Sequence, residues 1–164
     1  MKKIVILFLL IIRISAQSDS TPPVLKSFSF TPDTINTTNS SADVLIKVTS
    51  NDDLSGFKYA WVRITSPSSN NQVSGTIWAN NDSTLSGNGD HSVQRIFNFS
   101  QYSEVGDWQL TQLGLADSAG NIKYYEPSDF STLGLDNKIH VISITDNTAP
   151  VLKSFSFTPD TINT

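Results

Sequence analysis

The segment "DVLIKVTSNDDLSGFKYAWVRITS" (43–66) decides the fold class. On both sides of its central turn residues, apolar side chains occupy every second position, which is the period of a β-strand with one buried face. These positions are Val44, Ile46 and Val48 before the turn and Ala60, Val62 and Ile64 after it. The intervening "SNDDLSG" is rich in turn-forming residues. The segment therefore predicts two strands, each with one face toward a core.

The same alternation continues along the chain and never settles into a helical period of 3.6. The expected strands are 24–30, 43–50, 57–66, 73–79, 92–100, 107–116, 122–125 and 138–145. Only "SDFSTLGL" (128–135) indicates a helical turn. Seven or eight short strands, regularly spaced and separated by Gly, Asn and Asp turns, predict an all-β sandwich.

A long internal repeat divides the chain. The run Pro23–Thr37 recurs without change as Pro150–Thr164, an offset of 127 residues. That period is too long for a solenoid unit but suits a whole domain. We therefore expect a β-sandwich module over 19–145, followed over 146–164 by a linker and the first strand of a truncated second repeat. A tandem array of such modules is the expected organisation.

The N-terminal stretch "MKKIVILFLLIIRISAQ" reads as a secretory signal peptide over residues 1–16. Lys2 and Lys3 form the positive region, Ile4–Ile12 the apolar region, and Ala16 a small residue at the cleavage point. Nine apolar residues are too few for a spanning helix, which needs about 20. A short N-terminal membrane anchor is the alternative. We expect a secreted or cell-surface protein without a membrane span.

Composition narrows the classes of partner. Cleavage after Ala16 would lower Lys plus Arg from 11 to 8 against 15 acidic residues, which changes the net charge from −4 to −7. Such an acidic chain is a poor nucleic-acid binder, since phosphate contacts come from clustered Lys and Arg. The chain has no cysteine. A module of this length must therefore be stabilised by its apolar core or by bound ions.

Three stretches carry a family resemblance: "DDLSGFKYAWVRITSPS", "GDWQLTQLGLADSAGNIKYY" and "DNTAPVL". They resemble the bacterial immunoglobulin-like repeats of large extracellular, adhesin-like proteins. The matching motifs are the turn Asp53–Gly56, the strand start Gly106–Trp108 and the hairpin Asp117–Asn121. The resemblance implies an immunoglobulin-like Greek-key sandwich that serves as a spacer or adhesion module. Its partners would be neighbouring repeats of the same protein, or cell-surface glycans or proteins.

Catalytic residues are sparse. The only histidines are His91, in the expected turn "SGNGDHS", and His140, which alternates with apolar residues as an outward strand residue. The chain has no HExxH motif, phosphate-binding Gly-rich loop or Cys/His metal set. Only two glutamates occur, Glu104 and Glu126, so no paired carboxylates for glycoside hydrolysis stand out. We expect no enzymatic activity in this chain.

Calcium is the one cofactor that the sequence suggests. In an immunoglobulin-like sandwich the B–C and F–G loops lie at the end where the chain enters, and oxygen-rich side chains from several segments are what Ca²⁺ requires. The candidate ligands are Asp52, Asp53, Asp117, Asn121 and Asp19, with Asp146 as the equivalent for the next repeat. The alternative is that no ion binds, because Asp and Asn also stabilise turns through local backbone hydrogen bonds.

Aromatic residues suggest a second site. Tyr59, Trp61 and Arg63 share the outward face of the strand 57–66, where exposed rings would stack on a sugar. A one-residue slip in register would instead place Tyr59 and Trp61 in the core. Trp108 is expected in the core, since Leu110 follows on the same face. The alternative function is therefore a carbohydrate-binding module appended to a secreted hydrolase.

Overall fold

The computed structural model describes residues 18–79, 88–144, 148–159 and 161. The expected signal peptide and Asp146 lie outside these residues. Nine strands and one short helix occur in the described part of the chain. They are β1 (Val24–Thr31), β2 (Thr34–Asn36), β3 (Ala42–Asp52), β4 (Phe57–Thr65), β5 (Gln72–Trp78), β6 (Gly89–Phe99), β7 (Gly106–Asp117), β8 (Ile122–Tyr125), α1 (Pro127–Thr132) and β9 (Lys138–Ile142). None of the described helices has the length and apolarity to cross a membrane.

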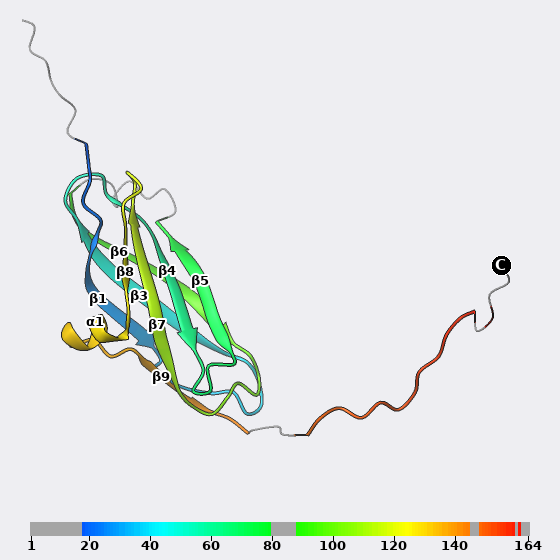
Figure 1. Ribbon diagram of the computed structural model, residues 1–164. Helices are drawn as coiled ribbons and strands as arrows, with labels where there is room; N and C mark the ends of the chain where they lie inside the picture. The colour runs from blue at the N-terminus through cyan, green and yellow to red at the C-terminus, as the bar shows by residue number, and fades with distance from the viewer. Residues whose placement is uncertain (1–17, 80–87, 145–147, 160, 162–164) are drawn as a thin grey trace, which may run out of the picture.

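The strands form two sheets that face each other as a sandwich (Figure 1). One sheet has the order β1-β3-β6, and the other has the order β2-β9-β7-β4-β5, with β8 also paired to β7. The predicted all-β sandwich is therefore confirmed.

The core lies between the sheets and follows the alternation in 43–66. The inward side chains of β3 and β4 are fully buried, with exposures of 0%. They are Val44, Ile46, Val48, Ala60, Val62 and Ile64. Trp108 is also buried, as predicted, and its ring meets Phe99 edge-on at 5.1 Å between centroids. Burial of this apolar surface is the main stabilising term available to a chain without cysteine.

Two short strands share one edge of β7. Residues 113–116 of β7 pair with β8, whereas residues 106–109 pair with β9. Both run antiparallel to β7, so together they form one strand that is interrupted at 126–137. The interruption contains α1, which begins with a capping box between Glu126 and Asp129 and buries Phe130 completely. This helix overlaps the predicted helical turn at 128–135 and begins one residue before it.

Two local features differ from the sequence-based predictions. Strand β2, which pairs in parallel with β9, was not predicted, because a three-residue strand is too short to show any periodicity. His91 does not lie in a turn. Strand β6 begins at Gly89, so His91 is a strand residue, only 2% exposed.

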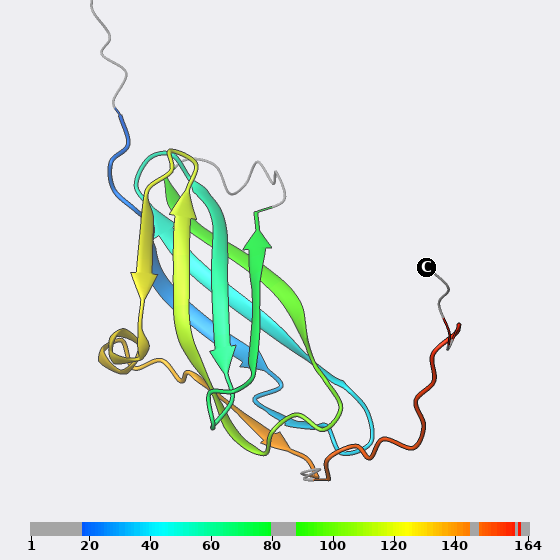
Figure 2. The same cartoon turned by 45° about the vertical axis from the view of Figure 1, so that its right-hand side comes forward.

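The chain enters the sandwich at one end and leaves it at the opposite end (Figure 2). Residues 18–23 approach at one end, and β9 finishes at the opposite end. Residues 148–159 form no strand, although they repeat the sequence of β1. Leu152 and Phe155 are 79% and 73% exposed, whereas their counterparts Leu25 and Phe28 are 3% and 7% exposed. The same residues are buried only where a partner strand, here β3, pairs with them.

A buried hydrogen bond joins the two sheets. The Tyr125 hydroxyl on β8 accepts the Leu25 backbone N–H of β1 at 2.9 Å. We expect Tyr125→Phe to lower the free energy of unfolding by about 1–3 kcal/mol, because it leaves a buried donor unpaired. Tyr124→Phe is the matched control, since that neighbour is 56% exposed, and its effect should stay within about 0.5 kcal/mol. Urea denaturation of both variants measures the difference; equal losses would contradict this role for the hydroxyl.

Candidate functional site

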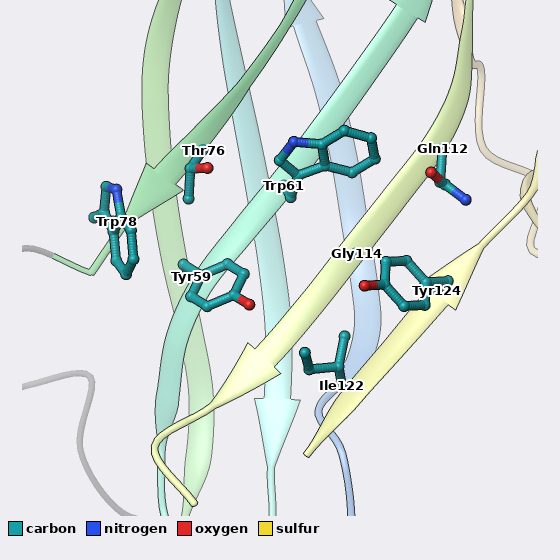
Figure 3. A pocket seen from close by; sticks show the side chains of 8 residues that line it. All are labelled: Tyr59, Trp61, Thr76, Trp78, Gln112, Gly114, Ile122 and Tyr124. Carbon is teal, nitrogen blue, oxygen red and sulfur yellow. The ribbon is translucent and has the colours of Figure 1, made fainter. Parts of the chain in front are cut away.

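A groove crosses the outer face of the larger sheet (Figure 3). It has a volume of about 490 Å³, and each of four adjacent strands contributes two residues. The lining residues are Tyr59 and Trp61 from β4, Thr76 and Trp78 from β5, Gln112 and Gly114 from β7, and Ile122 and Tyr124 from β8. We call this surface the aromatic groove.

The strand register creates the aromatic groove. Along one row, Thr76 lies opposite Trp61, Trp61 opposite Gly114, and Gly114 opposite Tyr124. Beside that row, Tyr59 faces Trp78, with the ring centroids 5.0 Å apart. Tyr59 and Trp61 therefore point away from the core, which excludes the one-residue slip. Such cross-strand neighbours stabilise a sheet and here also bring four aromatic rings to one surface.

Gly114 lies at the centre of the groove, against the ring of Tyr124. A Cβ atom at this position would lie 2.9 Å from Cε1 of Tyr124, closer than such atoms approach in proteins. The missing side chain lets the Tyr124 ring approach β7. Arg63, the third residue predicted at this site, does not line the groove; its guanidinium lies 4.9 Å from the centre of the Trp61 ring. That contact is a cation–π interaction.

A second cluster lies at the end of the sandwich where the chain approaches. Asp19, Asp52 and Asp53 each place a carboxylate oxygen within 4.8 Å of the other two. Asp52 is only 1% exposed, and its Oδ2 accepts the backbone N–H groups of Leu54 at 3.1 Å and Gly56 at 2.6 Å. Its other oxygen, Oδ1, is buried and has no hydrogen-bond partner among the described residues. We call these three residues the acidic cluster.

Asp19 links the N-terminal segment to both neighbouring turns. Its Oδ2 accepts the Ser55 N–H at 2.9 Å, and its backbone carbonyl accepts the Asn121 side-chain amide at 3.3 Å. The hydrogen bond from the Ser55 side chain, followed by that from the Thr21 backbone, holds the pKa of Asp19 below its usual value. Asp19 therefore stays ionised in its position beside Asp52 and Asp53.

The other two predicted ligands have a structural role in their hairpin. Asp117 is fully buried, and its Oδ1 accepts the N–H groups of Gly120 at 2.6 Å and Asn121 at 2.8 Å. Its Oδ2 accepts the Asn121 side-chain amide at 2.6 Å. These bonds are those expected for an Asp that closes a turn. The structure thus brings Asp19, Asp52 and Asp53 together and places Asp117 and Asn121 beside them, outside the acidic cluster.

Comparison with known proteins gives one result. The model of one protein family, described as "Domain of unknown function (DUF7035)", matches residues 18–164. The chain belongs to this family. No curated protein and no solved structure matches it. Any function of this DUF7035 domain must therefore be inferred from its own structure, above all from the aromatic groove and the acidic cluster.

Asp117 offers a direct test of its structural role in the DUF7035 domain. Asp117→Ala removes the acceptor of three N–H groups at a fully buried site. The free energy of unfolding should fall by about 2–4 kcal/mol. Asp33→Ala replaces an exposed aspartate and should change it by less than about 0.5 kcal/mol. Denaturant titration of the two variants measures both values, and a near-neutral Asp117→Ala would show that the hairpin does not depend on this carboxylate.

Proposed function

We propose that this domain is a non-enzymatic, extracellular adhesion module with an immunoglobulin-like Greek-key fold that binds carbohydrate in the aromatic groove. The observation that carries the proposal is the gathering of Tyr59, Trp61, Trp78 and Tyr124 on one outer sheet face. Apolar pockets with a few placed polar groups are the usual form of small-ligand sites. The negative faces of aromatic rings attract the positively polarised C–H bonds of a sugar.

Exposure and polarity favour a sugar as the ligand. Trp78 and Tyr124 are 53% and 56% exposed, so their rings are available for stacking. Gln112 and Thr76 add an amide and a hydroxyl for hydrogen bonds to sugar hydroxyls. The Gln112 amide is held by a 2.9 Å hydrogen bond that it donates to Glu126. All described lining residues are uncharged, which favours a neutral ligand over a phosphate or a charged peptide.

The sheet orders support the finer fold assignment. A three-stranded sheet β1-β3-β6 faces a sheet in which β9, β7 and β4 are neighbours. Strands A, B and E opposite G, F and C have this arrangement in immunoglobulin-like sandwiches. In this assignment the G strand is divided into β8 and β9. The expected signal peptide supports secretion or display at the cell surface.

A non-enzymatic role agrees with the placement of the histidines. His140 is an exposed residue of β9, and its Nδ1 lies 2.9 Å from Oδ1 of Asp107, which lowers the pKa of that carboxyl. His91 is buried in β6. Neither lines the aromatic groove.

A plain spacer is the second candidate. The approach of the chain at one end of the sandwich and the exit of β9 at the other support it, because modules linked in this way extend in a line. The two candidates differ in one measurable respect: a spacer binds no ligand in the groove.

Carbohydrate binding is tested with a glycan array, followed by calorimetric titration of the best ligand. Trp78→Ala and Tyr124→Ala should each weaken binding by about 5- to 150-fold, because the loss of one stacking ring costs roughly 1–3 kcal/mol where aromatic side chains stack on planar ligands. Phe157→Ala is the control, since this ring is 72% exposed but does not line the groove. A wild-type protein that binds nothing on the array would favour the spacer.

A further inference from the structure

The buried oxygen of Asp52 is the unexplained feature at the acidic cluster. A buried carboxylate is costly unless both oxygens are paired. Two backbone N–H groups satisfy Oδ2, whereas Oδ1 has no partner among the described residues. Two further carboxylates lie beside it instead of a donor, each with an oxygen within 4.8 Å of an Asp52 oxygen. Like charges at this distance repel each other, and among the described residues no Lys or Arg forms an ion pair with these three carboxylates.

We propose that Asp19, Asp52 and Asp53 bind a calcium ion, with Oδ1 of Asp52 as the buried ligand. Two oxygens that each coordinate one Ca²⁺ at about 2.4 Å lie no more than roughly 5 Å apart. The observed spacing, within 4.8 Å for all three pairs, meets this condition. The proposal is independent of carbohydrate binding, because none of the three residues lines the aromatic groove.

The donor set favours calcium among the common cations. All three ligands are hard carboxylate oxygens, and the described residues of the cluster include no His nitrogen of the kind that zinc prefers. Asp53 is exposed, so water has access to complete a shell of six to eight oxygens. Mg²⁺ requires a stricter octahedral arrangement and gives up its own waters reluctantly. A flexible shell that combines side chains with water suits calcium better.

The ion would join three parts of the domain. Asp52 is the last residue of β3, Asp53 belongs to the following turn, and Asp19 belongs to the segment that precedes β1. Asp19 already accepts hydrogen bonds from Ser55 and Asn121. Calcium would therefore fasten the N-terminal segment to the end of the sandwich.

Thermal unfolding and calorimetry test this proposal on the chelator-treated full chain. Extracellular modules bind Ca²⁺ with a Kd of about 10⁻⁴–10⁻³ M, so about 10 mM Ca²⁺ should raise the Tm by roughly 3–8 °C over EDTA. Calorimetric titration should show one site per chain. In NMR spectra, the backbone amides of Ser55 and Gly56 should shift, since both donate to carboxylates of the cluster.

Asp53→Asn is the decisive variant. Asp53 accepts no hydrogen bond within the described part of the chain, and without an ion its carboxylate repels those of Asp19 and Asp52. Its replacement should therefore keep the Tm in EDTA or raise it slightly, and should reduce the calcium-induced rise to less than about 1 °C. Asp33→Asn, at an exposed position remote in sequence, should retain the full rise. The proposal fails if calcium leaves the wild-type Tm unchanged, if Asp53→Asn responds like the wild type, or if Mg²⁺ produces an equal rise.

Discussion

The register of β4 is the constraint on which both faces of the larger sheet depend. Its inward side chains Ala60, Val62 and Ile64 are fully buried, while Tyr59 and Trp61 between them line the aromatic groove. A shift of one residue would exchange the two sets, exposing the core residues and burying the aromatic ones. The proposed binding surface is therefore held in place by the same alternation that builds the core.

The alternation explains what could be predicted from sequence. All eight expected strands occur. Period two placed Tyr59 and Trp61 on one face of their strand, and the observed register then decided that this face points outward. The rest of the groove could not be predicted, because Thr76, Trp78 and Tyr124 reach it through the pairing of their strands with β4 and β7. The period of apolar residues along a strand does not show which other strand will pair with it. The strands at 122–125 and 138–145 were predicted as separate elements, but their shared pairing with one edge of β7 was not, for the same reason.

The acidic cluster and the neighbouring Asp117 hairpin show which features of a metal site the sequence can predict. Loop positions in a sandwich correctly suggested that residues near 19, 52 and 117 lie at one end. Composition could not separate an aspartate that closes a turn from one with an unpaired oxygen, since both occur in turns rich in Asp, Asn and Gly. Hydrogen bonds make the distinction: Asp117 is satisfied by its own hairpin, whereas Asp52 has partners for only one of its oxygens among the residues that the structure describes.

The parallel pairing of β2 with β9 has a mechanical consequence. Tension between the two ends of the sandwich would pull β2 toward its N-terminal side and β9 toward its C-terminal side. Because the strands are parallel, these forces act in opposite directions along the strands and across the hydrogen bonds between them. Bonds such as that from Thr37 N–H to the Ile142 carbonyl then bear the load together in shear. The shortest of the described strands is thus placed to resist stretching.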